Sequence, residues 1–71
     1  MTDERFMRLV GKRIREIRMS RGLTQEEMQN FGFNYRYYQF IESGTINLTL
    51  KTLNRIANAF KIARRDLFDF D

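Results

Sequence analysis

The chain of 71 residues contains no cysteine, no histidine, no proline and no tryptophan. Without cysteine and histidine it has no disulfides, no thiol nucleophile and none of the usual ligands of a zinc site. Its nine carboxylates are scattered along the sequence, and no glycine-rich phosphate loop accompanies them. No general base with an orienting partner can be assembled, so we expect no enzyme, no cofactor and no metal, and we predict no small-molecule effector.

Long hydrophobic runs are missing as well. No stretch of about 18 apolar residues could span a membrane, and no short apolar stretch follows a basic start as in a signal peptide. We therefore expect a cytoplasmic protein without a membrane partner. A chain of this length builds one small core, so residues 1–71 are expected to form a single domain. Tight helix packing or a second copy of the chain must supply the rest of its stability, and we expect a dimer.

Charge is present but uneven. Thirteen Lys and Arg against nine Asp and Glu give a net charge of +4, and residues 1–21 hold seven of the bases but three of the acids. A basic excess favours a polyanionic partner such as nucleic acid, although many small proteins are basic for solubility alone. A basic amphipathic helix could also lie on a membrane surface, but here its apolar face has partners elsewhere in the chain.

The turn-forming residues divide the chain into pieces of helical length, and no strand pattern competes with them. Residues 3–20 are the first piece, which ends before Gly22. Its apolar side chains recur at spacings of four, four and three, which predicts one amphipathic stripe made of Phe6, Val10, Ile14 and Ile17.

A helix-turn-helix spacing follows. Thr24 is an N-cap and Glu27, three residues later, completes a capping box, which predicts a helix over residues 24–31. A glycine ends this helix, and Asn34 then caps a third helix over residues 34–43. Two helices joined by a turn of three or four residues that contains glycine are typical of a helix-turn-helix motif.

Two further pieces complete the chain. Thr49 caps a fourth helix, whose predicted stripe consists of Leu50, Leu53, Ile56 or Ala57, and Phe60. Residues 64–70 add a turn or two, in which Leu67 and Phe68 are expected to fold back and Phe70 to stay near the surface. The predicted fold class is all-α, a compact bundle of about five short helices.

The third helix and the turn before it carry most of the rings, because residues 31–40 hold six of the ten aromatic side chains. Projected at about 100° per residue, Tyr38 and Ile41 lie on the inner side of the helix. Phe31 and Phe33 are expected to join them in the core. The outward face collects Tyr35, Arg36, Gln39, Phe40 and Ser43, with Tyr37 and Glu42 on its flanks.

This outward face has the chemistry of a major-groove reader. An arginine can bond O6 and N7 of guanine, a glutamine can bond N6 and N7 of adenine, and a ring edge can pack on a thymine methyl group. We predict that the base-reading residues for double-stranded DNA are Tyr35, Arg36, Gln39 and Phe40. The alternatives are that the two rings cover the ends of the core or join a dimer contact, and that Arg36 is a solvated charge.

Three runs of the sequence resemble a known family: GKRIREIRMSRGLTQEEM, GFNYRYYQFIESG and NLTLKTLNRIANAF. Over roughly residues 10–68 the chain is similar to the Cro and lambda-repressor type of helix-turn-helix DNA-binding domain, also called the XRE family. The resemblance implies a five-helix bundle that regulates transcription as a homodimer on a (pseudo)palindromic operator, with the third helix in the major groove.

The resemblance also assigns roles to matching residues. Gln25, at the start of the second helix, would bond a DNA phosphate, and Asn47, in the loop after the third helix, would contact the DNA backbone again. The expected backbone contacts are completed by Asn34, Ser43 and Thr45. Arg18 and Glu42 match a pair that links the first helix to the end of the third. From the residues alone they form only a possible salt bridge, worth about 0 to 1 kcal/mol if exposed.

The chain departs from the family pattern in three ways. The stretch from the second helix to the end of the third is one residue shorter than usual, and Gln29 replaces a small alanine, which leaves the packing angle of the motif open. Thr45 and Ile46 occupy loop positions that are often basic, which removes phosphate contacts. Phe40 replaces a usually polar base-reading residue.

The C-terminal third carries more apolar surface than one small domain needs. We place the two-fold contact of a homodimer there, on Phe60, Leu67, Phe68 and Phe70. The competing function is a protein-interaction module, such as an antitoxin or an accessory subunit, that binds another protein through the aromatic face of the third helix.

Overall fold

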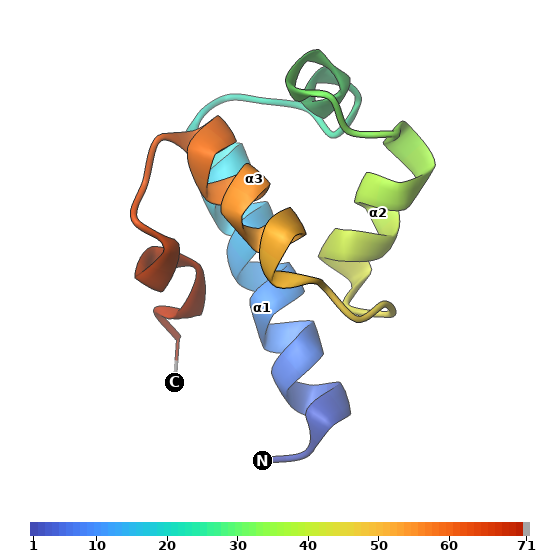
Figure 1. Cartoon of the computed structure of the whole chain (residues 1–71), viewed down its shortest axis with the longest axis vertical. Helices are drawn as coiled ribbons and strands as arrows, with labels where there is room; N and C mark the ends of the chain where they lie inside the picture. Colours follow the sequence, from blue (N-terminus) through green and yellow to red (C-terminus); the bar gives the residue numbers. More distant parts are fainter. Residues whose placement is uncertain (71) are drawn as a thin grey trace.

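A computed structural model describes residues 1–70, which form three α-helices and two short 3₁₀ helices (Figure 1). In chain order these are α1 (Asp3–Ser20), η1 (Glu26–Phe31), α2 (Tyr35–Ser43), α3 (Leu50–Phe60) and η2 (Arg64–Phe68). No strand occurs in this range. The predicted all-α fold class is confirmed, although two of its pieces are 3₁₀ turns.

Helix α1 is the long central element, with α2 on one side of it and the C-terminal segment on the other (Figure 1). Its stripe contributes Val10, Ile14 and Ile17 to the core as predicted. Phe6 belongs to the same predicted stripe, but its side chain remains 44% exposed. It lies near the free N-terminal end of α1, where its ring stacks on Phe68 at a centroid distance of 6.1 Å.

The second helix forms where it was predicted, but with tighter winding. The reciprocal capping box is present: the Thr24 N–H donates to the Glu27 carboxylate at 2.9 Å, and the Glu27 N–H donates to the Thr24 hydroxyl at 3.1 Å. The helix itself is 3₁₀ over Glu26–Phe31, not α. Since a 3₁₀ helix rises about 2.0 Å per residue against about 1.5 Å in an α-helix, it spans a similar length with fewer residues. The 3₁₀ winding therefore compensates for the residue that this chain lacks, relative to the family pattern, between the second helix and the end of the third.

Phe31 was predicted to be buried, and this is wrong: its side chain is 42% exposed. Met28, one turn earlier, fills the core-facing position of η1 and is fully buried. Phe31 stands at the last position of the helix and extends past the edge of the core. Phe33, in the turn that follows, enters the core as predicted and packs on Tyr38 at 5.7 Å between ring centroids.

The predicted caps of α2 and α3 are confirmed. The side chain of Asn34 accepts the Tyr37 N–H at 2.9 Å, and the Thr49 hydroxyl accepts the Thr52 N–H at 3.1 Å. The inner face of α3 is formed by Leu53, Ile56, Ala57 and Phe60. Leu50 was assigned to the same stripe, and this is wrong, because at the first position of α3 it projects beyond the core and is 85% exposed.

Two glycines bring the backbones of α1 and the C-terminal end of α2 into close contact. A Cβ atom on Gly11 would lie 2.6 Å from the Glu42 carbonyl oxygen, and one on Gly44 would lie 2.6 Å from the Cα of Arg8. Side chains at either position would push the two helices apart. The C-terminal end of α2 is therefore fixed against α1.

The C-terminal segment packs on α1 and α3 through Leu67, which is fully buried. Of the last two rings, Phe68 was expected to fold back, but its side chain is 39% exposed. Phe70 was expected to stay near the surface, and its side chain is partly buried, with its ring 6.0 Å from that of Phe6. None of the helices in residues 1–70 is long and apolar enough to cross a membrane.

Candidate nucleic-acid interface

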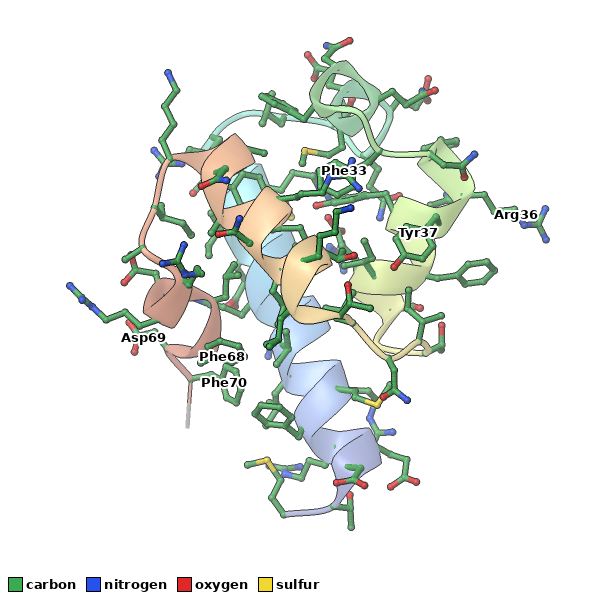
Figure 2. The ribbon with its side chains drawn as sticks, in the orientation of Figure 1. Phe33, Arg36, Tyr37, Phe68, Asp69 and Phe70 are labelled. Atoms are coloured by element: carbon green, nitrogen blue, oxygen red, sulfur yellow. The ribbon has the colours of Figure 1, made fainter. Side chains whose placement is uncertain are left out.

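The outward face of α2 has the composition that the helical projection predicted. Arg36, Gln39 and Phe40 are exposed, and Tyr35 is partly buried at the edge of the face. Figure 2 shows the Arg36 side chain extending away from the body of the protein. Its guanidinium lies 5.9 Å from the centroid of the Phe40 ring, one turn along the helix, a separation at which a cation and a ring attract. Phe40 therefore also supports the guanidinium next to it.

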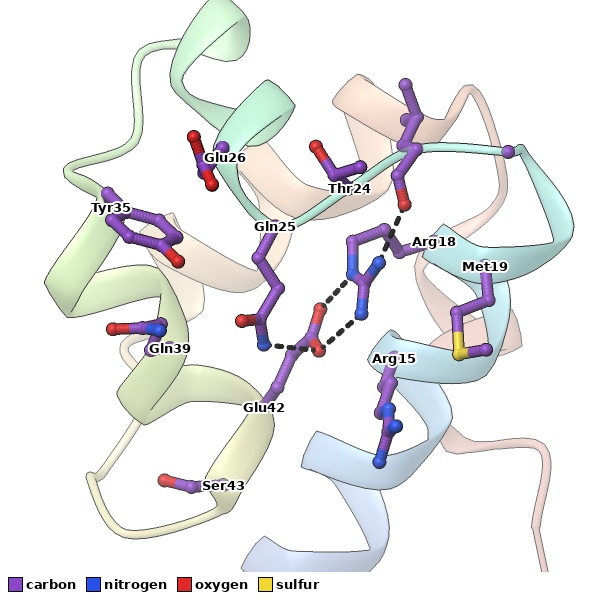
Figure 3. Close-up of a pocket in the computed structure, with 12 residues that line it drawn as sticks. Arg15, Arg18, Met19, Thr24, Gln25, Glu26, Tyr35, Gln39, Glu42 and Ser43 are labelled. Carbon is purple, nitrogen blue, oxygen red and sulfur yellow. Dashed lines mark hydrogen bonds and ion pairs between the residues drawn. The ribbon is translucent and has the colours of Figure 1, made fainter.

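A cleft of about 640 Å³ runs beside this face, between α1, η1 and α2 (Figure 3). Tyr35, Gln39 and Ser43 line it from α2, and Gln25 lines it from the turn that opens η1. Arg15 of α1 lines the cleft as well. Sequence reasoning missed this residue and counted it only within the basic excess of the N-terminal third. Its position three residues before Arg18, on the same side of α1, is the signal that could have found it.

The Arg18–Glu42 pair forms the floor of the cleft (Figure 3). Arg18 donates to both oxygens of Glu42, with Nε at 2.7 Å from Oε2 and Nη2 at 3.1 Å from Oε1, and Nη1 donates to the Leu23 carbonyl at 2.6 Å. The pairing that the resemblance implied is confirmed. Both residues are 8% exposed, so the pair is buried, unlike the exposed salt bridge considered from the residues alone.

The electrostatics of the pair keep both side chains charged. Burial by itself raises the pKa of Glu42, but the polar groups of Arg18, Tyr38 and Gln25 around its carboxylate outweigh this effect, and the net pKa lies below the ordinary value of a glutamate. The hydrogen bond to Glu42 raises the pKa of Arg18. A buried charged pair with this many partners holds α1, η1 and α2 in one arrangement.

Tyr38 contributes an unusual group beside this pair. Its side chain is fully buried, and within residues 1–70 its hydroxyl has no hydrogen-bond partner. Burial is the main reason that the pKa of Tyr38 is raised, and the nearby Glu42 carboxylate adds to the effect. The hydroxyl is therefore neutral and adds no charge to the floor of the cleft.

Several predicted backbone-contacting residues already have intramolecular partners. The Gln25 amide donates to Glu42 at 3.0 Å, and the Asn34 side chain caps α2. The Ser43 hydroxyl donates to the Phe40 carbonyl at 2.8 Å and lies 2.7 Å from the hydroxyl of Thr45. These contacts fix the orientation of each side chain. Gln29, which replaces a small alanine of the family pattern, is exposed on η1, and its side-chain amide donates to the carbonyl of Glu26.

Asn47 is exposed but lies away from the cleft. It lines a second groove of about 200 Å³ formed by α1, the loop before α3, and Phe68. The apolar walls of this groove include Phe6, Ile46, Leu48 and Leu53. The predicted base-reading residues therefore lie beside one depression of the surface, and Asn47 beside another.

The predicted dimer surface is only partly available. Phe60 is 2% exposed and Leu67 is fully buried, so both belong to the core and cannot meet a second copy. The excess of apolar residues that suggested an interface is the packing of η2 on α1 and α3. Phe68 and Phe70 remain near the surface in the C-terminal segment (Figure 2). Both rings lie against that of Phe6, at centroid distances of 6.1 Å and 6.0 Å.

An all-α bundle with a capped short helix, a glycine turn and an exposed polar and aromatic helix face defines a helix-turn-helix protein. Residues 14–67 match the model of the helix-turn-helix family HTH_3, and the chain belongs to this family. It is a DNA-binding transcriptional regulator, and the family is not one of enzymes.

The chain is similar to one protein named as a transcriptional regulator and to two named as control or controller proteins. The chain is 40% identical over 60 residues to an HTH-type transcriptional regulator of Archaeoglobus fulgidus, an alignment that covers 83% of this chain and 86% of the relative. It is 33% identical over 64 residues to the control protein C.BamHI of Bacillus amyloliquefaciens, which covers 87% and 79% of the two chains. The crystal structure of the restriction-modification controller protein C.AhdI from Aeromonas hydrophila superposes with a TM-score of 0.82 at 33% identity, covering 87% of this chain and 96% of that one.

Proposed function

We propose that this protein binds double-stranded DNA sequence-specifically as a homodimer on a (pseudo)palindromic operator, with α2 in the major groove. The observation that carries the proposal is the outward face of α2, which presents Arg36, Gln39 and Phe40 next to a cleft that also contains Arg15. A guanidinium, an amide and a ring on one helix face match the donors, acceptors and methyl groups of the major groove.

Each side chain has a role that follows from its chemistry. Arg36 reads guanine, Gln39 reads adenine, and Phe40 packs on a thymine methyl while it supports the guanidinium of Arg36. Tyr35 reads bases from the edge of the same face. Contacts to the DNA backbone come from Gln25, Asn34, Ser43, Thr45 and Asn47.

Arg15 supplies phosphate charge that the loop after α2 lacks. Thr45 and Ile46 are uncharged, so the loop contributes no cation to the DNA backbone. Arg15 lines the cleft from α1 and can reach a phosphate on the strand next to Gln25. The affinity should therefore retain a salt dependence in spite of the neutral loop.

We place the homodimer contact on the ring cluster of Phe6, Phe68 and Phe70, at the C-terminal end of the described chain. The Phe6 ring lies 6.1 Å from that of Phe68 and 6.0 Å from that of Phe70, and the side chains of Phe6 and Phe68 are 44% and 39% exposed. Two copies that met here would cover apolar surface that a monomer leaves in water. An isologous contact of this kind gives the two-fold symmetry that a palindromic operator requires.

One relative is named as the control protein C.BamHI, and the solved structure of C.AhdI is titled as that of a restriction-modification controller protein, 96% of which is covered by this chain. This likeness in sequence and fold favours the same regulatory setting for this protein. The DNA upstream of a neighbouring restriction or modification gene is therefore the first natural duplex to test.

Selection of bound duplexes from a random pool tests the proposal. We expect one palindromic consensus, with half-sites separated by about 34 to 36 Å, or one helical turn, or a multiple of it. Equal and weak affinity for all duplexes at physiological salt would overturn the proposal.

A protein-interaction module is the second candidate, and two exposed rings favour it. Phe31 is 42% exposed and Tyr37 is 37% exposed, and neither lies on the face assigned to DNA. Exposed rings are common anchors of protein interfaces. A stable complex with a co-purifying protein, together with no shift of any duplex in a gel, would support this function over DNA binding.

A further inference from the structure

Helix α2 is fixed by different contacts at its two ends. Its C-terminal end lies against α1 through Gly11 and Gly44, and Glu42 there is paired with Arg18. The N-terminal end presents Tyr35 and Arg36 and is reached through a turn of three residues, 32–34. The orientation of the reading face therefore depends on what holds this turn.

Arg55 of α3 contacts the turn in two ways. Its Nη2 donates to the Gly32 carbonyl oxygen at 2.9 Å, and its guanidinium carbon lies 4.6 Å from the centroid of the Phe33 ring. Phe33 in turn packs on Tyr38, inside α2. A chain of contacts thus runs from α3 through the turn into the first half of the recognition helix.

Gly32 allows this arrangement. Its φ of 88° lies in the left-handed region, which glycine adopts without strain, and in this conformation its carbonyl accepts from Arg55 of α3. A Cβ atom at this position would lie 3.3 Å from Nη2 of Arg55, so the guanidinium sits directly against the glycine.

We propose that Arg55 is a positioning residue for base reading, which clamps the turn before α2 and so sets the tilt of that helix. The proposal rests on the function proposed above, in which α2 reads bases. At about 1.5 Å per residue the nine residues of α2 span about 13 Å, so a rotation of about 5° about its C-terminal end moves the first turn by about 1 Å. A hydrogen bond to a base tolerates only about 0.5 Å of variation in its length.

Arg55 is exposed, and an exposed hydrogen bond and an exposed stack are each weak. We therefore expect its loss to affect the geometry of α2 more than the stability of the protein. A plain surface cation would instead act on every duplex alike, by its charge.

Amide hydrogen exchange in the DNA-free protein is the first test. The Tyr37 N–H is bound by the Asn34 side chain and the Tyr38 N–H by the Asn34 carbonyl, so both report on the first turn of α2. In Arg55→Met we expect both amides to exchange about tenfold faster, while the Ile41 amide keeps its wild-type rate. Unchanged exchange at Tyr37 and Tyr38 would overturn the proposal.

The second test compares affinity for the selected operator with affinity for a scrambled duplex. Arg55→Met should lower operator affinity about tenfold, as when one bidentate base contact is weakened, and change scrambled-duplex affinity less than about twofold. The matched control Arg65→Met removes an exposed cation from η2. It should leave the ratio of operator affinity to scrambled-duplex affinity unchanged. If Arg55→Met loses the same affinity for both duplexes, Arg55 acts only through its charge, and the proposal is overturned.

Arg55→Lys keeps the charge but loses the planar stack on Phe33. We expect it to bind the scrambled duplex as the wild type does and to lose part of the operator preference. If Arg55→Lys shows the wild-type amide exchange at Tyr37 and Tyr38 and the wild-type operator preference, the proposal is overturned. If the wild type itself does not discriminate between duplexes, the proposed function fails, and the exchange measurement still decides whether Arg55 clamps the turn.

Discussion

Arg18 is a cation with 8% of its surface exposed, and its charge is balanced by a carboxylate on another helix. Replacing it with methionine leaves Glu42 buried without its main partner. We expect Arg18→Met to lower the free energy of unfolding by about 3 to 5 kcal/mol, measured by chemical denaturation. Arg15→Met removes an exposed cation from the same helix and should change stability by less than about 0.5 kcal/mol. Similar losses in both variants would contradict this account of the pair.

The same pair predicts a dependence of stability on pH. Because the pKa of Glu42 is lower in the folded protein, its contribution is fully present above the unfolded-state value of about 4.3. The contribution is lost as the pH falls through the lower, folded-state pKa. We expect the free energy of unfolding of the wild type to fall more steeply below about pH 4 than that of Glu42→Gln. Parallel curves would show that this carboxylate is not the group responsible.

The burial or exposure of a side chain was predictable from the sequence where its angular position around a helix alone determines it. Tyr38 and Ile41 are buried, and Arg36 and Gln39 are exposed, because a regular helix fixes which side chains share a side. Residues at the ends of helices were not predictable in this way. Phe31 and Leu50 point past the core because no neighbouring element extends over them.

At the scale of elements, the starts of helices were the most predictable features. The side chains of Thr24, Asn34 and Thr49 cap the backbone three residues ahead, which is a local interaction that the sequence displays. The winding of η1 was missed, because it depends on how many residues must span a distance that other elements set. The position of Arg55 against the turn was missed for a related reason, since 23 residues separate it from Gly32.

The close packing of α1 on α2 gives a prediction for Gly11. Alanine favours an α-helix over glycine by about 1 kcal/mol, so an unconstrained site would gain stability. Here the added Cβ would lie 2.6 Å and 2.8 Å from two backbone carbonyl oxygens of α2, which cannot rotate away. We expect Gly11→Ala to lose about 1 to 3 kcal/mol of stability in chemical denaturation.

Lys12→Ala provides the control for Gly11→Ala. The position is exposed on the same helix and should show only the small gain of a better helix former. A Gly11→Ala variant as stable as the wild type would mean that α1 and α2 are not in the tight contact described.

For the whole molecule, the distribution of apolar surface was the least predictable feature. Phe60 and Leu67 were expected at a dimer contact but are core residues, because η2 folds onto α1 and α3 and covers them. Composition counts apolar residues but does not show which of them a distant segment will cover. The surface that we propose for a two-fold contact is the ring cluster of Phe6, Phe68 and Phe70.

The placement of the two-fold contact predicts the behaviour of surface variants. Phe68→Asp puts a charge into the proposed interface at a 39% exposed position, so the fold should persist while the dimer dissociates. Sedimentation should show a monomer, with the helical circular dichroism of the wild type. The control Phe31→Asp alters a ring of similar exposure on η1 and should remain dimeric. A Phe68→Asp variant that stays dimeric would exclude this surface.

The central claim is that the outward face of α2 reads the bases, and the base preference of Arg36→Ala tests it most directly. In the same duplex selection as for the wild type, we expect Arg36→Ala to lose about 1 to 3 kcal/mol of operator affinity and to relax preference at one base pair in each half-site. Gln25→Ala, as a control, should weaken binding to all duplexes alike. A base preference in Arg36→Ala that matches the wild type at every position would contradict the account.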